Sequence, residues 1–211
     1  MIDYYANLIS SFLIFGTYTM YNDYNNYNKL KVRSNKELNI IYNKVIPNVI
    51  LNVHILSIPA IYYFNKLLQN PAYHLLKNLP LPAKYIVLPI LVDIMFYSVH
   101  RLLHSKYLYY FHKRHHELIH PIGIGSFYMS PVEFYGALVI PIFAPLILLG
   151  ADNINTHLWI TFTVYNGMCV SHSNTKNLSE FHDYHHNIYK YNFGIDIFMD
   201  RLFGTKKNYD S

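Results

Sequence analysis

Eight histidines fall in three short boxes in the second half of the chain, and their spacing is that of metal ligands. The boxes are "HRLLH", "HKRHH" and "HDYHH", which contain His100, His104, His112, His115, His116, His182, His185 and His186. In a chain of 211 residues with 13 histidines, an H-x-x-H-H pattern should arise by chance only about 0.05 times. On a helix, positions i, i+3 and i+4 share a face, so each box is expected to point its imidazoles at one place.

The number of histidines indicates two metal ions. Imidazole binds iron, zinc, copper and nickel, and a single zinc usually takes three or four protein ligands. Eight boxed histidines, with His172 of "SHSN" as a ninth, exceed that by a factor of about two. A binuclear centre without cysteine or many carboxylates favours oxygen activation over hydrolysis. The isolated His54, His74 and His157 are instead expected to be structural.

The stretch "HKRHHELIHP" at 112–121 also allows a different frame. From His116 it spells H-E-x-x-H, in which Glu117 would be the general base of a zinc metalloprotease and His120 a second ligand. Pro121 argues against this frame, because its ring would collide with the carbonyl of Glu117 and end the helix. The protease remains the alternative enzyme, and a metal-binding membrane scaffold without turnover is the non-enzyme alternative.

The composition places the boxes in a membrane protein. Of the residues, 52% are hydrophobic and only 14% charged, which is too apolar for an ordinary soluble domain. The predicted fold is an all-α integral membrane helical bundle of about four spans, or three spans plus a re-entrant hairpin, with a histidine-rich helical cap. The spans are expected near 2–20, 45–64 and 85–103, with a shorter pair near 134–149 and 157–170.

The basic residues predict which end of the bundle faces the cytosol. They cluster between the first two spans and beside the boxes, whereas the loop 65–83 has only Lys66 and Lys77. By the positive-inside rule the histidine cap is cytosolic. This topology accounts for the net charge of +5. The sequence shows no basic stripe on a soluble module of the kind that would indicate nucleic-acid binding. The chain is divided into N-terminal spans and loops, 1–83, and a domain with the histidine boxes, 84–211.

Asp93 is a further candidate for the site. It precedes His100 by seven residues and His104 by eleven, so a helix would place it on their face. A carboxylate inside an apolar span is costly and usually functional. We expect it to accept the N–H of a ligand imidazole and so to fix the tautomer of that ring.

The boxes and their surroundings resemble the fatty acid hydroxylase/sterol desaturase superfamily of membrane di-iron enzymes, and within it most closely the C-4 methylsterol oxidases. The resemblance covers about residues 90–206 and is carried by "HRLLHSKYLYYFHKRHHE", "HPIGIGSFYMSPVEF" and "FHDYHHNIYKYNFGIDIFMDRLFGT". One departure is Ser130, which stands where relatives commonly have a histidine before Pro131. His120 is also not a position of the family pattern.

The resemblance implies an O2-dependent attack on a lipid C–H bond at two iron ions, for which zinc can substitute. It implies sterol C-4 methyl oxidation first and fatty acyl hydroxylation next, in the endoplasmic reticulum membrane of a eukaryotic cell. The chain shows no haem, flavin or nicotinamide motif, so electrons are expected from an external NAD(P)H-fed donor such as cytochrome b5. Acid and base side chains cannot break an unactivated C–H bond, which is why a metal is needed.

Overall fold

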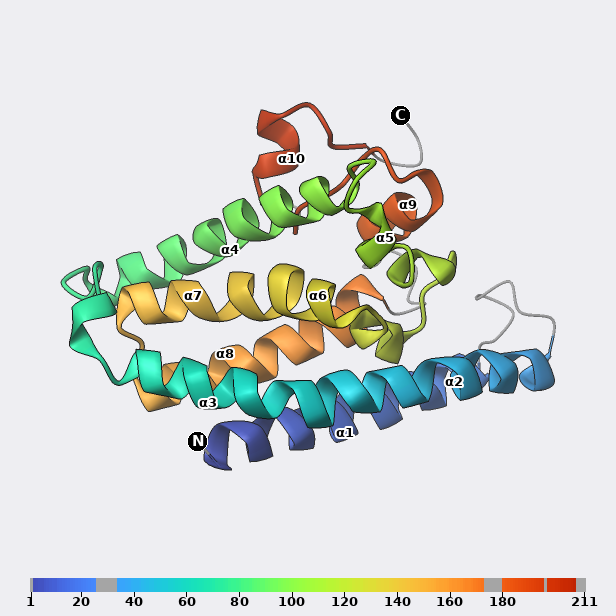
Figure 1. Ribbon diagram of the computed structural model, residues 1–211, viewed down its shortest axis with the longest axis horizontal. Helices are drawn as coiled ribbons and strands as arrows, with labels where there is room; N and C mark the ends of the chain where they lie inside the picture. The colour runs from blue at the N-terminus through green and yellow to red at the C-terminus, as the bar shows by residue number, and fades with distance from the viewer. Residues whose placement is uncertain (1, 26–33, 173–179, 196, 208–211) are drawn as a thin grey trace.

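All elements of the computed structural model are helical within the residues it describes, which are 2–25, 34–172, 180–195 and 197–207. The long helices run side by side along the longest axis and the histidine-bearing segments gather at one end (Figure 1). The predicted all-α fold with a histidine-rich cap is confirmed.

Five long rods make up the bundle in the described part of the chain. Two are single helices, and three combine α-helical turns with a widened, π-helical segment of six residues. The rods are α1 (Ile2–Asn25); α2 (Asn35–Ile50), η2 (Leu51–Leu56) and α3 (Ser57–Leu68); α4 (Leu81–Leu103); α6 (Pro131–Glu133), η6 (Phe134–Val139) and α7 (Ile140–Leu149); and α8 (Asn153–Tyr165) with η7 (Asn166–Ser171).

The remaining elements are short and connect the rods or form the cap. They are η3 (Pro71–Tyr73), α5 (Tyr109–His112), η4 (His115–Glu117), η5 (Gly123–Phe127), α9 (Glu180–Ile188) and α10 (Met199–Leu202). In Figure 1, α5 and α9 lie together past the end of α4, and α10 lies against α4.

Three of the rods are long and apolar enough to cross a membrane: Lys36–Leu68, Leu81–Leu103 and Pro131–Leu149. They contain the spans predicted near 45–64 and 85–103, and they show that the segment predicted near 134–149 is a helix of 19 residues. About 20 residues cross the hydrocarbon core, so this third helix has the length of a full crossing.

The spans predicted near 2–20 and 157–170 are helical, as α1 and α8, but neither is among the three membrane-length helices. Some of their mutual contacts are polar. The Asn7 side-chain amide donates to the His157 carbonyl at 2.9 Å, and the Thr161 hydroxyl donates to the Asn7 side-chain oxygen at 3.0 Å. The polar residues that join these two helices lower their hydropathy.

The turn between α7 and α8 reverses the chain, so that α8 runs back toward the histidine-bearing end of the bundle (Figure 1). Gly150 closes α7 with φ 57°, a left-handed conformation that favours glycine. Asp152 then caps α8 by accepting the Asn155 backbone N–H at 2.8 Å. The Lys84 ammonium donates to the Leu149 carbonyl at 2.8 Å, which satisfies one of the terminal carbonyls of α7.

The two predicted segments, 1–83 and 84–211, share one hydrophobic core. Leu38 and Val45 from the first segment pack in one cluster with Ile122, Phe127 and Met168 from the second. Each fully buried aliphatic side chain contributes about 1.5–3 kcal/mol. The cap is therefore packed onto the helices of segment 1–83 as well as onto those of segment 84–211.

The arrangement predicts the sidedness of three engineered cysteines in membrane vesicles. Lys113→Cys and Lys190→Cys lie at the histidine end, so a membrane-impermeant thiol reagent should label both from the same side. Lys77→Cys lies in the connection at the opposite end and should label from the other side. The native Cys169 is buried, so the wild-type chain supplies the background. Labelling of positions 113 and 190 from opposite sides would contradict the fold.

Candidate metal centre

The structure gathers all nine predicted histidines at the cap, in two adjacent groups. The ring nitrogens within each group lie within 4.8 Å of one another. The first group is His100, His104, His112, His116 and His185, and the second group is His115, His172, His182 and His186. His120 belongs to neither.

Each H-x-x-H-H box supplies both groups, which differs from the expectation that a box points at one place. In the second box α5 ends at His112, and His115 begins a separate 3-10 turn, so the box does not lie on one helix face. In the third box, on α9, His182 and His186 are four residues apart and share a face, while His185 points to the first group. The rings of His116 and His186 are 4.8 Å apart, which makes the two groups neighbours.

The ring nitrogens lie at distances that suit a metal ion between them. In the first group, the Nε2 atoms of His100 and His112 are 3.0 Å apart, and those of His112 and His116 are 2.9 Å apart. In the second group, the Nε2 atoms of His172 and His115 are 3.3 Å apart. Two ligands at a right angle on a metal with bonds of about 2.1 Å would be about 3.0 Å apart. The spacing fits a metal ion.

The tautomers lead to the same conclusion. The Nδ1 atoms of His100 and His185 lie 2.7 Å and 2.6 Å from the carbonyl oxygens of Phe193 and Tyr191. A carbonyl only accepts, so each Nδ1 carries the hydrogen and each Nε2 carries a lone pair. These lone pairs turn toward the other rings of the group, where they are placed to bind a metal ion.

Burial keeps the imidazole rings in their neutral form. Eight of the nine histidines are buried, and only His104 is partly exposed. Desolvation lowers the pKa of His104 to about 2, of His115 to about 4 and of His172 to about 3, from the ordinary value of 6.5. The rings are therefore neutral at pH 7, as metal binding demands.

A buried carboxylate that the sequence analysis missed orients one of the rings. The Glu133 Oε1 accepts the His112 Nδ1–H at 2.7 Å, and both side chains are almost completely buried. Ser130 caps the first turn of α6 by accepting the Glu133 backbone N–H at 3.2 Å. The signal in the sequence was a carboxylate at the start of an apolar span, which is the same signal that drew attention to Asp93.

Asp93 does not contact a histidine, and its predicted role is wrong. It is buried on α4, but its carboxylate accepts the backbone N–H groups of Ile195, Phe198 and Met199 at 2.9–3.0 Å. The C-terminal loop, which joins α9 to α10, passes over this face of α4. The carboxylate therefore binds the loop rather than an imidazole.

Asp93 acts on the ligands through that loop. Asp200 accepts the backbone N–H groups of Phe193 at 2.9 Å and of Gly194 at 2.6 Å. A Cβ on Gly194 would lie 2.6 Å from an Asp93 oxygen and 2.8 Å from an Asp200 oxygen, so only glycine fits between the two carboxylates. Together they fix the Phe193 carbonyl that orients His100.

The second group has its own support, from α2 and η2. The Asn52 side-chain amide donates to the carbonyls of Phe127 at 2.8 Å and Met129 at 3.1 Å, and Asn48 accepts the Met129 N–H at 3.0 Å. This fixes the loop whose Tyr128 carbonyl lies 3.3 Å from the His115 Nδ1. The amino-acid pattern gave no signal for either asparagine.

The H-E-x-x-H frame does not fit the geometry. Glu117 lies on the surface, where it pairs with the Lys44 ammonium at 2.7 Å and accepts the Tyr128 hydroxyl at 2.8 Å. His116 and His120 do not share a helix, because the turn at His115–Glu117 is a single 3-10 segment. The carboxylate that a protease would aim at its metal is turned away.

Comparison with known proteins gives a single family. Residues 85–205 match the family model for fatty acid hydroxylase. The chain is 31% identical to "Fatty acid hydroxylase ahd1" of Mycosarcoma maydis over 182 residues, 30% identical to "Very-long-chain aldehyde decarbonylase GL1-11" of Oryza sativa subsp. indica over 217 residues, and 36% identical to "Methylsterol monooxygenase 2-2" of Arabidopsis thaliana over 136 residues.

These matches differ in extent. They cover 80%, 92% and 57% of this chain, and 46%, 77% and 51% of the respective relatives. The chain therefore spans about half the length of two of these relatives and about three quarters of the third. No solved structure matches significantly.

A matched pair of carboxamide variants tests the assignment of the two glutamates. Glu133→Gln should weaken metal binding about 10- to 100-fold, as is usual when the partner of a ligand imidazole is lost. Glu117→Gln should leave metal binding unchanged, because Glu117 faces Lys44. Chelator competition on purified protein measures both. Loss of metal from the Glu117 variant alone would restore the protease frame.

The metal-free protein should lose stability as the pH falls below about 6.5. The unfolded chain takes up protons on histidine near this pH, whereas the folded rings of His104, His115 and His172 do so only near pH 2–4. Each such histidine contributes a slope of up to about 1.4 kcal/mol per pH unit between the two pKa values. The thermal midpoint in detergent should fall from pH 8 to pH 5. A flat profile over this range would contradict the burial of neutral rings.

Proposed function

The chain belongs to the fatty acid hydroxylase family, and from this premise we propose that it is a membrane di-iron oxidoreductase that uses O2 to hydroxylate or desaturate a lipid. The observation that supports it best is the pair of histidine groups in a chain with three membrane-length helices. The first group would hold one iron ion and the second group the other. Zinc would fit the same ligands.

Two iron ions would supply the activation of O2 that an unactivated C–H bond requires. In hydroxylation, one oxygen atom enters the C–H bond and the other leaves as water, with consumption of two electrons and two protons. The chain contributes the ligands, the carbonyls and Glu133 that orient them, and a buried, water-excluding environment.

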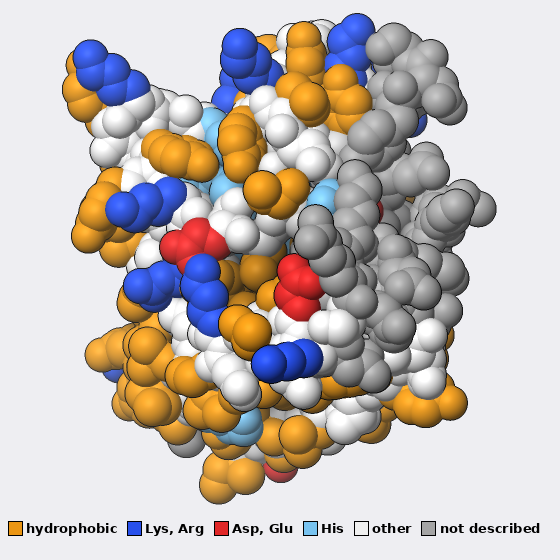
Figure 2. Space-filling view, turned by 90° about the vertical axis from the view of Figure 1, so that its right-hand side faces the viewer, with side chains coloured by type: hydrophobic (Ala, Val, Ile, Leu, Met, Phe, Trp, Pro, Cys, Tyr) orange, Lys and Arg blue, Asp and Glu red, His pale blue; other side chains and the backbone are white. Residues whose placement is uncertain are grey.

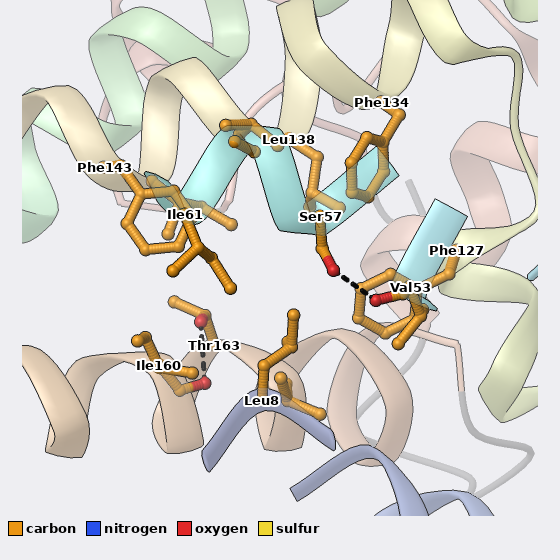
Figure 3. Close-up of a pocket in the computed structure, with 14 residues that line it drawn as sticks. Leu8, Val53, Ser57, Ile61, Phe127, Phe134, Leu138, Phe143, Ile160 and Thr163 are labelled. Carbon is orange, nitrogen blue, oxygen red and sulfur yellow. Dashed lines mark hydrogen bonds between the residues drawn. The ribbon is translucent and has the colours of Figure 1, made fainter. Parts of the chain in front are cut away.

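An apolar cavity lies between the rods beneath the cap, and we propose it as the lipid site. It is bounded by α1, α3, the η6–α7 rod and α8, and runs from Phe127 and Phe134 toward Ile61 and Phe143 (Figure 3). Phe134 follows Glu133 directly, so this end of the cavity adjoins the residue that holds His112. The hydroxyls of Ser57 and Thr163 at its wall donate to carbonyls of their own helices.

Two lipid classes are candidates for this cavity. The resemblance of "HRLLHSKYLYYFHKRHHE" to methylsterol oxidases favours a sterol C-4 methyl group, and a relative named methylsterol monooxygenase agrees with it. The shape of the cavity favours a fatty acyl chain. Its volume is only about 50 Å³, and it follows the η6–α7 rod from Phe134 to Phe143 as an elongated space. Flexible side chains can make room for a linear chain more readily than for a rigid ring system.

We propose that electrons come from cytochrome b5 or a similar NAD(P)H-fed protein. Figure 2 shows the histidine end of the molecule with lysine and arginine side chains spread over it. Such a surface suits an acidic partner. By the positive-inside rule, the same basic residues support a cytosolic location for this end, and in a eukaryotic cell the membrane would be that of the endoplasmic reticulum.

Lipid-dependent oxygen consumption tests the function. Purified protein loaded with iron and supplied with a reductase should consume O2 when a sterol or acyl substrate is present, and His115→Ala should abolish this by removing a ligand of the second group. Expression in cells that lack their own sterol C-4 oxidase, followed by lipid mass spectrometry, separates the substrates. Loss of accumulated 4-methylsterols supports the sterol, and new hydroxyacyl chains support the fatty acid.

The non-catalytic scaffold makes the opposite prediction. It would bind two metal ions but show no lipid-dependent oxygen uptake with any member of a broad lipid panel. A ratio of one zinc per chain that does not respond to iron supply would contradict the di-iron proposal itself.

A further inference from the structure

We propose that Tyr189 is a positioning residue for the first histidine group, and that its ring fixes the orientation of His116 by packing where other ligands are fixed by a hydrogen bond. The inference rests on the proposed two-metal function. It is carried by the backbone strain at Tyr189, the contact of its ring with His116 and the lack of a hydrogen-bond partner for the Nδ1 of that histidine among the described residues.

The backbone of Tyr189 is in a conformation that a tyrosine rarely adopts. It follows the last residue of α9 with φ 60°, and its N–H donates to the His185 carbonyl at 2.8 Å. This is the left-handed position that ends many helices, and it is usually occupied by glycine because a Cβ is strained there. Strained residues of this kind cluster at functional sites.

The reversal of the chain does not by itself require a side chain. The turn after α9 brings the Tyr191 carbonyl to the His185 Nδ1, and a glycine at position 189 would allow the same path with less strain. The tyrosine ring is therefore what distinguishes this residue from the expected glycine.

That ring packs against a ligand of the first group. Its centroid is 4.6 Å from the centroid of His116, with the two planes at 88°, the edge-to-face arrangement that aromatic pairs favour. Tyr109 lies 6.4 Å from Tyr189 and 6.3 Å from His116. The ring of Tyr189 is partly exposed, so it covers His116 from the solvent side.

In the described part of the chain, His116 is a ligand whose Nδ1 lacks the hydrogen bond that orients three other rings of the first group. In the first group, His100 and His185 are oriented by carbonyls and His112 by Glu133. The Nδ1 of His116 is buried and has no hydrogen-bond partner among the described residues. Without a hydrogen bond at Nδ1, ring rotation must be limited by packing, and Tyr189 supplies the closest edge-to-face contact of His116 outside the histidines.

Zinc release from three variants at position 189 tests the role of the ring. Wild-type protein loaded with two equivalents of Zn²⁺ is titrated with a chromogenic chelator, and two release steps are expected. Tyr189→Gly should weaken one step about 10- to 100-fold, the range seen when support for a ligand is lost, and should leave the other unchanged. Tyr189→Phe should keep both steps, and Tyr189→Ala should behave as Tyr189→Gly does. His116→Ala identifies the affected step, because it should weaken the same one.

Two controls separate positioning from general damage. The metal-free Tyr189→Gly protein should melt at or above the wild-type temperature, since glycine relieves the strain, so a weaker zinc step cannot be attributed to unfolding. Tyr110→Ala removes an exposed tyrosine whose ring contacts are to Phe111 and Lys113, and it should leave both steps unchanged.

Unchanged zinc release from Tyr189→Gly would overturn the inference, and so would a Tyr189→Phe protein as weak as the glycine variant, because the hydroxyl would then be the important group. A single release step in the wild-type protein would contradict the two-metal proposal instead. The response of that step to Tyr189→Gly would still decide the role of Tyr189.

Discussion

Repulsion among nine clustered imidazoles is the constraint on which the rest of the structure depends. Their unprotonated nitrogens face one another at 2.9–3.3 Å in a largely buried cap. A buried polar atom without a partner costs about 1–3 kcal/mol, so even a few such nitrogens would offset a large part of the roughly 5–15 kcal/mol by which a domain is stable. Metal binding at such a site is therefore also a contribution to folding. This is the physical reason to regard the metals as part of the fold.

A second layer of the structure turns these rings in the required direction, and it is built mainly from backbone carbonyls. The carbonyls of Phe193 and Tyr191 belong to the C-terminal loop, and that loop is fixed to α4 by Asp93, whose partners are more than 100 residues away in the chain. The carbonyl of Tyr128 is fixed by Asn52. Buried side chains from distant elements thus set the tautomers of the ligands without touching them.

The predictable part of this architecture is local, and the unpredictable part is tertiary. Three- and four-residue spacings indicated the eight boxed histidines, and apolar runs indicated the membrane-length helices, because both signals depend on neighbouring residues alone. The division of each H-x-x-H-H box between two groups could not be predicted, since it follows from the end of α5 at His112. Asp93 is buried, but its predicted imidazole partner was wrong, because no local pattern shows that the loop between α9 and α10 covers it. Glu133 carried a comparable signal in the sequence and is the carboxylate that reaches an imidazole.

The rods that cross the membrane also carry the cap, and this coupling determines how a lipid could meet the metals. His100 lies in the last turn of α4, and Glu133 in the first turn of the α6–η6–α7 rod, whose side chains also line the cavity. The walls of that cavity are apolar, and the hydroxyls of Ser57 and Thr163 donate to their own helices. Apolar walls impose few directional contacts on a lipid. Which carbon reaches the cap must therefore depend on the length and shape of the cavity between Phe134 and Phe143, which the same rods hold at a constant depth relative to the histidines.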